Sequence, residues 1–149
     1  MAEPLMIRGR PSRSAAVALL AAEGLPVADV TDAHLEHFFC VGSDESPTAL
    51  VGLEIYETDA LLRSLVVGPD ARTKGLGSAL VRHAEHYAAA RHVQAIYLLT
   101  TTAESFFERL GYRRVDRMQA PASIQSTREF ASLCPVNSVF MIKRLDPER

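Results

Sequence analysis

Hydrophobic positions follow two different periods along the chain, and each change of period marks a predicted element. Alternating apolar and polar residues, or short continuous apolar runs, predict strands over residues 5–9, 38–42, 48–57, 60–67, 95–101, 112–115 and 137–145. Apolar residues spaced three to four apart predict helices over residues 12–24, 30–39 and 103–111, and a further helix after Gly75. Residues 116–135 show neither period, so we expect them to be irregular.

Capping residues support these helices. Ser12 or Ser14 suits the start of the first helix and Gly24 its end, while Thr31 or Asp32 suits the start of the second. The helix after Gly75 has the clearest apolar face, which consists of Leu76, Leu80, Ala84, Tyr87 and Ala88. Its opposite face, which we expect to be solvated, carries Arg82, Glu85 and His86.

The order of elements predicts an α+β (mixed α/β) fold. Strands 48–57 and 60–67 are separated by a short turn at Thr58 and Asp59, which favours an antiparallel hairpin. Helices lie both before and after this hairpin, so one mixed sheet with helices on both faces is the expected packing. With 149 residues and no linker-like stretch, we expect a single domain over residues 1–149.

Composition and charge exclude several classes of function. The net charge of −2 gives no general attraction for nucleic acid or anionic membranes, so neither is an expected partner. No apolar run approaches the roughly 20 residues of a membrane span. Cys40 and Cys134 are far apart in sequence and form no C-x-x-C pair, as expected of free thiols in the cytoplasm.

The segment "SLVVGPDARTKGLGSALVRHAEHY" carries the main chemical signal. Gly75 and Gly77 permit a tight turn and a close approach of the backbone, and the unpaired N–H groups of a helix start favour an anion. Arg72 and Lys74 add positive charge, so the segment suits a diphosphate. It is not a Walker loop, because Lys74 precedes the glycines, and Leu80 replaces the third glycine of a dinucleotide fingerprint.

The pattern R-x-x-G-x-G over residues 72–77, after a strand that ends "LVVGPD", resembles the acetyl-CoA loop of the GNAT superfamily of N-acetyltransferases. The segment "TTTAESFFERLGY" resembles that family's next strand and helix. The resemblance implies the GNAT acyl-CoA N-acyltransferase fold, a mixed and mostly antiparallel sheet with a splay between strands four and five. It also implies acetyl-CoA as cosubstrate and no metal. The histidine pairs 34/37 and 83/86 lack a third ligand and predict no metal site.

The resemblance also implies where acetyl-CoA binds. Backbone N–H groups for the pyrophosphate would come from Lys74, Gly75, Leu76, Gly77 and Ser78. Arg72 and Thr73 would shape the turn. Leu65, Val66 and Val67 would line one side of the pantetheine arm, and the strand around Thr100 would line the other. Phe106 would contact the CoA tail. The Val67 N–H would hold the oxyanion that forms when an amine attacks the thioester directly.

The chain departs from the family pattern at the expected catalytic positions. Thr100 stands where many relatives carry asparagine, and Phe107 stands where they carry the tyrosine that protonates the CoA thiolate. A carboxylate used by some relatives falls at Leu61. The usual acid and base are therefore both absent.

Three residues remain as candidates for catalysis, each with an alternative. Glu54 is a possible general base or an exposed edge carboxylate. Ser64, close to the expected thioester, is otherwise a buried serine bonded to backbone. Cys134 is a candidate at the acceptor end or an inert buried thiol.

The acceptor is suggested by a narrower resemblance. "YLLTTTAESFFERLGYRRV" and "REFASLCPVNSVFMIKRL" are similar to small GNAT proteins associated with arsenic resistance and, more distantly, to N-acetylglutamate synthases. Both imply a small amino-acid-like acceptor, such as a glutamate analogue with a phosphinate or arsinate group. Arg63 and Arg128 are the guanidinium groups expected to bind its carboxylate, although Arg63 has Glu54 or Glu57 as alternative partners. Lys143 and Arg144 are expected to be solvated.

Two other functions remain open at this point. The missing acid and base also fit a non-catalytic domain that binds acetyl-CoA as a sensor. An acetyltransferase for peptide or protein amines is a further alternative. Either a monomer or a homodimer is expected.

Overall fold

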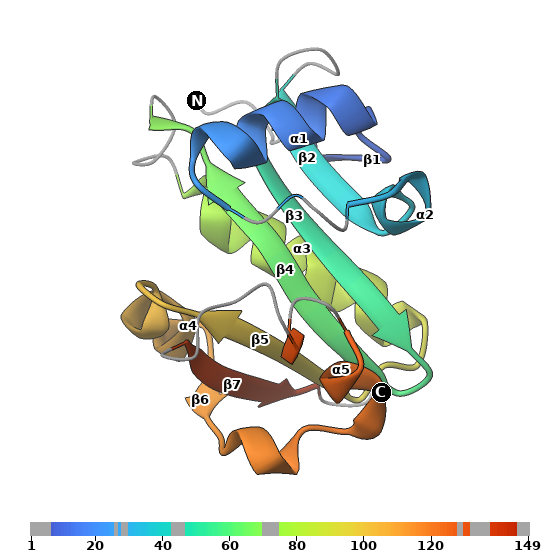
Figure 1. The fold of residues 1–149 in the computed structure, drawn as a ribbon, viewed down its shortest axis with the longest axis vertical. Helices are drawn as coiled ribbons and strands as arrows, with labels where there is room; N and C mark the ends of the chain where they lie inside the picture. Colours follow the sequence, from blue (N-terminus) through green and yellow to red (C-terminus); the bar gives the residue numbers. More distant parts are fainter. Residues whose placement is uncertain are drawn as a thin grey trace. The chain divides into compact units, whose positions relative to one another are not determined.

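The computed structural model describes residues 7–25, 27, 30–42, 47–69, 75–127, 130–131 and 138–145. Within these residues, hydrogen-bonded strands form one sheet in the order β1-β2-β3-β4-β5-β7-β6 (Figure 1). The strands are β1 (Ile7–Gly9), β2 (Phe38–Gly42), β3 (Pro47–Tyr56), β4 (Asp59–Val67), β5 (Ala95–Thr100), β6 (Arg113–Arg114) and β7 (Val139–Arg144). The helices are α1 (Arg13–Ala22), α2 (Asp32–Leu35), α3 (Leu76–Ala90), α4 (Glu104–Arg109) and α5 (Ala122–Gln125), with a 3₁₀ helix, η2 (Arg117–Gln119).

The predicted fold class is confirmed. The sheet is mixed and mostly antiparallel, and its parallel pair is β4 with β5. Two expectations for elements are wrong in detail. The second helix stops at Leu35 because β2 begins at Phe38, and the region predicted to be irregular contains η2 and α5.

Side-chain caps fix the start of the first two helices. The Ser12 hydroxyl accepts a hydrogen bond from the Ala15 N–H at 3.2 Å, which stabilises the first turn of α1. At α2, the Thr31 hydroxyl accepts from the His34 N–H, and the His34 ring accepts in return from the Thr31 N–H. These contacts select Ser12 and Thr31 from the predicted alternatives, and they give His34 a role in capping.

The chain divides into two compact units that share elements. Unit 1 consists of residues 1–53 and 64–84, and unit 2 of residues 54–63 and 85–149. The unit boundaries fall inside β3, β4 and α3, so each of these three elements contributes residues to both units.

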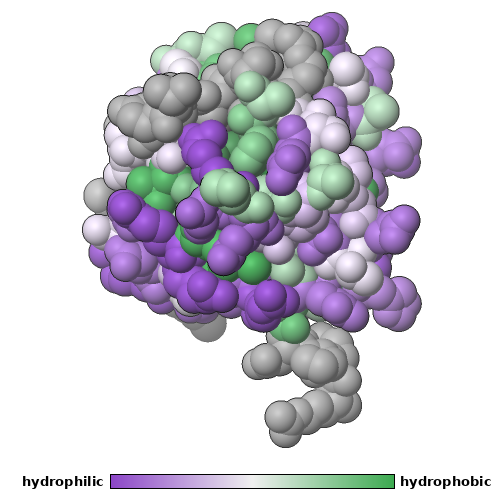
Figure 2. Space-filling view, turned by 60° about the horizontal axis from the view of Figure 1, so that its bottom comes forward, coloured by the Kyte–Doolittle hydropathy of each residue, from purple (hydrophilic) through white to green (hydrophobic). Residues whose placement is uncertain are grey.

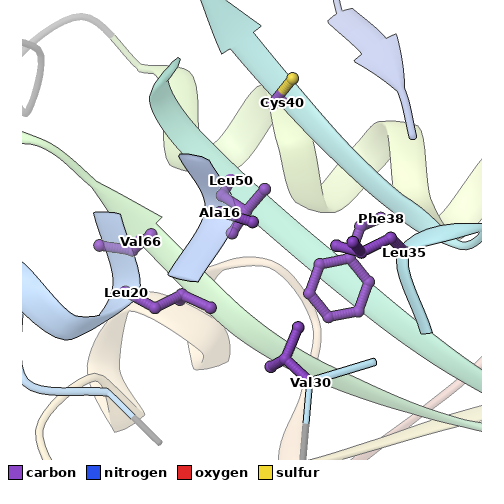
Figure 3. Packing of buried hydrophobic residues seen from close by; sticks show 8 residues of the cluster. All are labelled: Ala16, Leu20, Val30, Leu35, Phe38, Cys40, Leu50 and Val66. Atoms are coloured by element: carbon purple, nitrogen blue, oxygen red, sulfur yellow. The ribbon is translucent and has the colours of Figure 1, made fainter. Parts of the chain in front are cut away.

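Unit 1 has its own hydrophobic core between helix α1 and the strands beside it. Ala16 and Leu20 of α1 face Leu50 of β3 and Val66 of β4 (Figure 3). Other buried members of this cluster are Val30, Leu35, Phe38 and Cys40. Burying side chains of this size stabilises the unit by about 1.5–3 kcal/mol each before entropy is counted.

The β2–β3 register in unit 1 depends on one glycine. Phe38 lies opposite Gly52, and its fully buried ring occupies the space that a Cβ at position 52 would need. An aromatic ring therefore fills the place of a side chain on the neighbouring strand. This close approach requires glycine at position 52.

Unit 2 has a second core on one face of β4, β5 and β7. Leu61 lies opposite Tyr97 on β5, and Tyr97 lies opposite Ile142 on β7, so these three residues form a row across the strands. The Tyr97 and Phe140 rings stack with centroids 5.4 Å apart. The remaining buried members are Ala95, Ala120 and Ile124, so η2 and α5 are held down by their apolar neighbours.

The described surface is largely polar. Hydrophilic residues surround smaller groups of hydrophobic ones on the face shown in Figure 2. Of the large hydrophobic side chains in the described ranges, Met118 is exposed. In the described part of the chain, no helix combines the length and the apolar character needed to cross a membrane.

Candidate functional site

The end of β4 has an unusual backbone. The parallel register with β5 runs from Asp59 opposite Ala95 to Leu61 opposite Tyr97, whereas β4 itself continues to Val67. Ser64, three residues beyond Leu61, is buried and has φ of +60°. A residue other than glycine in this left-handed region costs about 1–3 kcal/mol and is typical of functional positions. The predicted splay between the fourth and fifth strands thus coincides with a strained residue.

The three residues of β4 after Ser64 alternate in burial. Val66 is buried in the core of unit 1, whereas Leu65 and Val67 on either side of it are half-buried. Alternation of this kind leaves the Leu65 and Val67 side accessible. These are residues predicted to line the pantetheine arm, and the prediction stays open.

The start of α3 provides backbone donors. Gly75 has φ of +71° and accepts the first helical hydrogen bond, from the Ala79 N–H at 3.1 Å. The preceding N–H groups of the first turn, those of Leu76, Gly77 and Ser78, therefore have no acceptor within the helix. Gly77 lies in the first turn of α3 and not in the turn before it. A partial positive charge at this helix start favours an anion.

Several predicted site residues lie outside the described residues. These are Arg72, Thr73, Lys74, Arg128 and Cys134. The predictions for the loop cations, for the second acceptor guanidinium and for the acceptor-side thiol therefore remain predictions.

The turn after β5 leads into α4. The Thr100 hydroxyl accepts a hydrogen bond from the Ala103 N–H at 3.0 Å, so Thr100 closes this turn in place of the family's asparagine. Phe107 is buried, and its ring meets the edges of Phe106 and Tyr112 with centroids 5.0 and 5.6 Å away. Phe107 is thus an apolar packing residue that has no proton to donate.

Glu54 and Arg63 meet in unit 2. Arg63 Nη1 donates to Glu54 Oε2 at 2.7 Å, and the two side chains are 0% and 6% exposed. The Tyr56 hydroxyl donates to the other oxygen, Glu54 Oε1. The alternative that Glu54 is an exposed edge carboxylate is wrong, because β3 is an interior strand between β2 and β4. Arg63 therefore has Glu54 as its partner, one of the two pairings given as the alternative to acceptor binding, and its role as an acceptor ligand stays a prediction.

Ser138 is a candidate that the sequence analysis assigned no role. Its hydroxyl is buried and has no hydrogen-bond partner among the described residues. A buried polar group without a partner costs about 1–3 kcal/mol, so a hydrogen-bond partner for this hydroxyl is expected from outside the described residues. Ser138 precedes β7, whose first residue, Val139, lies opposite Thr100. In the sequence, Ser138 falls inside the predicted strand 137–145, a position that by itself indicates no role.

Arg117 lies beside Ser138. Arg117 Nη2 donates to the Ser138 backbone carbonyl at 3.1 Å, and its guanidinium lies 5.6 Å from the Phe130 ring centroid. Phe130 in turn meets the edge of Phe140. These contacts hold η2 against the start of β7.

Lys143 is not solvated as predicted. Its Nζ donates to both oxygens of Glu85, at 3.0 and 3.2 Å, and to the Leu110 carbonyl at 2.8 Å. Tyr112 donates to the same Glu85 carboxylate at 3.0 Å. Glu85 was expected on the solvated face of its helix. Its side chain is instead 14% exposed, and both carboxylate oxygens accept hydrogen bonds. Burial and the Glu85 charge both raise the pKa of Tyr112.

In the ranges that the structure covers, His, Cys, Asp and Glu form no group of three or more that could hold a metal ion.

Comparison with known proteins identifies the family. The model of the acetyltransferase (GNAT) family matches residues 14–112, which is more than half of the chain. The chain therefore belongs to the acetyltransferase (GNAT) family, whose enzymes are acyltransferases that use acetyl-CoA.

Individual relatives agree with this assignment. The chain is 29% identical over 92 residues to the uncharacterized N-acetyltransferase CT2212 of Chlorobaculum tepidum, a match that covers 61% of this chain and 59% of that protein. The N-acetylglutamate synthase of Neisseria gonorrhoeae, solved with coenzyme A and N-acetyl-glutamate, superposes with a TM-score of 0.80 at 18% identity. That match covers 98% of this chain and 36% of the synthase.

A third relative has a similar length. Rv2747 from Mycobacterium tuberculosis, solved in complex with CoA, superposes with a TM-score of 0.75 at 17% identity, and the match covers 94% of this chain and 99% of that one. Identities this low show the shared fold. The chain thus spans about three fifths of the curated relative and about one third of the Neisseria synthase.

Proposed function

We propose that this chain is an N-acetyltransferase that moves the acetyl group of acetyl-CoA to the amine of a small amino-acid-like acceptor. The observation that carries the proposal is the parallel β4–β5 pair with its strained Ser64, in a chain whose family is that of GNAT acetyltransferases. We also propose that residues 1–149 form one acetyltransferase domain. The protein acts in the cytoplasm as a monomer or homodimer, and it has no nucleic acid or membrane partner.

Acetyl-CoA binding is assigned to two segments. The pyrophosphate is bound by the N–H groups at the start of α3, supported by the left-handed Gly75 and by the unpaired donors that follow it. Arg72, Thr73 and Lys74 complete the loop. Leu65, Val66 and Val67 bind the pantetheine arm, and Thr100 and Phe106 are further proposed contacts of acetyl-CoA.

The acceptor is assigned to Arg63 of β4 and to Ser138, the residue before β7. Arg63 binds a carboxylate of the acceptor, and the Ser138 hydroxyl, which has no hydrogen-bond partner among the described residues, supplies a second hydrogen bond. Arg128 is the second proposed guanidinium. The Neisseria synthase was solved with N-acetyl-glutamate, which supports a glutamate-like acceptor. A phosphinate or arsinate analogue, in arsenic resistance or detoxification, is the specific proposal.

The reaction is a direct transfer. The neutral amine attacks the thioester carbonyl and a C–N bond forms; the nitrogen then gives its extra proton to water, and the C–S bond breaks as the tetrahedral intermediate collapses. The Val67 N–H stabilises the oxyanion. Thiols have a pKa near 8.5, so the CoA thiolate leaves without a tyrosine acid and takes its proton from water. Glu54 is a weak candidate for the base, because Arg63 and Tyr56 already bind its two oxygens.

A second function is favoured by one observation. Phe107 is buried among aromatic rings, and a hydroxyl is absent where the family's acid stands. An acetyl-CoA sensor would need no acid. Such a protein would bind acetyl-CoA and release no CoA with any amine.

The test is CoA-thiol release from acetyl-CoA with a panel of amines. The panel contains glutamate, phosphinothricin, an arsinate amino acid, aminoglycosides, polyamines and a lysine peptide. Release with an amino-acid analogue supports the proposal. Release with the peptide alone makes the chain a peptide acetyltransferase. Binding of acetyl-CoA without release from any amine favours the sensor.

A further inference from the structure

Helix α4 is held at both ends by a cation from another element. At its start, Arg114 of β6 donates to both oxygens of Glu104, at 3.2 and 2.9 Å. At its end, Lys143 of β7 donates to the Leu110 carbonyl at 2.8 Å. A helix of six residues is too short to be stable on its own, so contacts such as these determine where α4 lies.

Both cations come from one strand pair. Arg114 lies opposite Met141 on β7, and Lys143 is two residues further along the same strand. Side chains at these positions leave the same face of a sheet, which is the face against which α4 packs through them. We call the Glu104–Arg114 pair the start clamp, and the bond from Lys143 to the Leu110 carbonyl the end clamp.

The two clamps differ in their exposure to water. In the start clamp, the Arg114 and Glu104 side chains are 66% and 33% exposed. In the end clamp, the Lys143 side chain is 27% exposed and is paired with Glu85, which is 14% exposed. Water and salt screen an exposed pair more than a partly buried one, so α4 has a firm end and a weaker start.

Aromatic rings anchor the middle of α4 to the firm end. Phe107 is buried, and its ring lies 5.6 Å from that of Tyr112, whose hydroxyl is bonded to Glu85. Phe106 is half-buried and meets the edge of the Phe107 ring at 5.0 Å. The first turn, which connects this aromatic group to the Thr100 turn, is thus the part of α4 that depends most on the start clamp.

We propose that the start clamp sets the affinity for acetyl-CoA by holding the first turn of α4 in place. Glu104 and Arg114 are positioning residues, and neither needs to touch acetyl-CoA. The end clamp is the fixed point from which the first turn loosens when the pair is broken. The proposal rests on the proposed function, in which Thr100 and Phe106 contact acetyl-CoA.

Charge reversal tests the start clamp. Arg114→Glu and Glu104→Arg each place two like charges side by side, and the double variant restores an attractive pair. Since an exposed ion pair changes an equilibrium by at most roughly fivefold, each single variant should weaken CoA binding by about two- to fivefold, and the double variant should recover most of the loss. The measurement is the dissociation constant of CoA by calorimetry. Direct attraction of CoA phosphates would instead make Arg114→Glu weaken binding and Glu104→Arg tighten it.

Hydrogen exchange of the protein without CoA provides a second measurement. The Phe107 N–H bonds to the Ala103 carbonyl in the first turn, whereas the Tyr112 N–H bonds to the Phe107 carbonyl beside the end clamp. Both single variants should lower the protection factor of the Phe107 N–H by about two- to fivefold and leave that of Tyr112 unchanged. Salt at 1 M, where the Debye length is about 3 Å, should act on the wild type in the same way, which needs no variant to fold.

The Arg10–Glu36 pair supplies the matched control. Its side chains are 74% and 56% exposed, and it joins the residue after β1 to the residue after α2. Arg10→Glu and Glu36→Arg make the same chemical changes in a pair with no proposed ligand. Both should leave CoA affinity and the exchange of Phe107 unchanged. Urea unfolding of all four single variants should give midpoints close to that of the wild type, so a change in CoA affinity is not a loss of fold.

Three outcomes overturn the inference. These are shifts in CoA affinity of opposite sign in Arg114→Glu and Glu104→Arg, no recovery in the double variant, or a Phe107 protection factor that neither variant nor salt lowers. Failure of the proposed function is a separate result, namely a wild type that binds no CoA or a Phe106→Ala variant that binds it as tightly as the wild type. In that case the exchange data still decide whether the start clamp holds α4.

Discussion

Single residues fix the backbone of this protein at two places where an ordinary side chain is unfavourable. Ser64 adopts a left-handed φ in the middle of a buried strand, and Gly52 gives its side-chain space to the Phe38 ring. The first residue stores strain next to the proposed thioester position. Gly52 lets the Phe38 ring approach the backbone of the neighbouring strand closely.

Gly52→Ala should destabilise the protein by about 1–3 kcal/mol, because the new Cβ overlaps the buried Phe38 ring. Urea unfolding followed by circular dichroism measures the change. Gly9→Ala is the matched control, since its Cβ would meet nothing closer than 3.8 Å. Adding Phe38→Leu should recover part of the loss, and an unchanged midpoint for Gly52→Ala would show that Phe38 moves freely.

At this scale, sequence reasoning named candidate residues but could not judge their surroundings. It selected Glu54, Arg63 and Ser64, all of which are buried, and their roles stay predictions. It could not show that Glu54 is buried, since this depends on strands β2 and β4 lying on both sides of β3. It gave Ser138 no role, because an unpartnered hydroxyl is visible only when its neighbours are known.

At the scale of elements, hydrogen bonds among Glu85, Lys143 and Tyr112 join helix α3, strand β7 and the turn after α4. Glu85 comes from α3, Lys143 from β7, and Tyr112 and the Leu110 carbonyl from the turn after α4. The Lys143 ammonium therefore stabilises the C-terminal end of α4 and neutralises Glu85 at the same time. Three elements that are distant in sequence are joined through one partly buried carboxylate.

The pKa of Tyr112 predicts an alkaline weakness. Burial raises this pKa above the ordinary value near 10, so the folded state keeps a proton that the unfolded state loses above about pH 10. The stability contributed by Tyr112 is thus present below pH 10 and is lost as the pH rises further, by up to about 1.4 kcal/mol per pH unit. Unfolding of the wild type between pH 9 and 11 should show a steeper loss than Tyr112→Phe, and parallel curves would contradict it.

The sequence predicted most elements because each carries its own period. All seven predicted strands are present, and Ser12 and Thr31 cap the first two helices. The second helix was predicted too long because "HFF" fits either period, and the sheet partner of Phe38 decides in favour of a strand. Helices η2 and α5 were missed because helices of three and four residues are too short to show a period.

Ligand binding should be visible in the stability of the whole molecule. At one hundred times its dissociation constant, CoA should add about 2.7 kcal/mol to the free energy of unfolding. For a chain of this size that raises Tm by about 5–10 °C. Differential scanning fluorimetry measures the shift.

The same measurement tests the start of α3. Gly75→Glu places a carboxylate where the pyrophosphate is proposed to bind, and it should abolish the shift in Tm. Gly75→Ala is the matched control, because it adds the same strain at φ of +71° without charge, and no atom of the described residues lies within 4 Å of the added Cβ. A full shift in Gly75→Glu would remove this helix start from the acetyl-CoA site.

The interleaving of the two units has a consequence for biosynthesis. Every residue assigned to unit 1 has been made once Ala84 is added, whereas unit 2 needs β7, which ends at Arg144. Ribosomes add about 5–20 residues per second, so several seconds separate these two points. Throughout that interval the hairpin with Glu54 and Arg63 exists without a complete β7, and until Thr100 is added it also lacks a complete β5. The nascent chain therefore holds two opposite charges on an unfinished surface, where water can solvate them until translation supplies their cover.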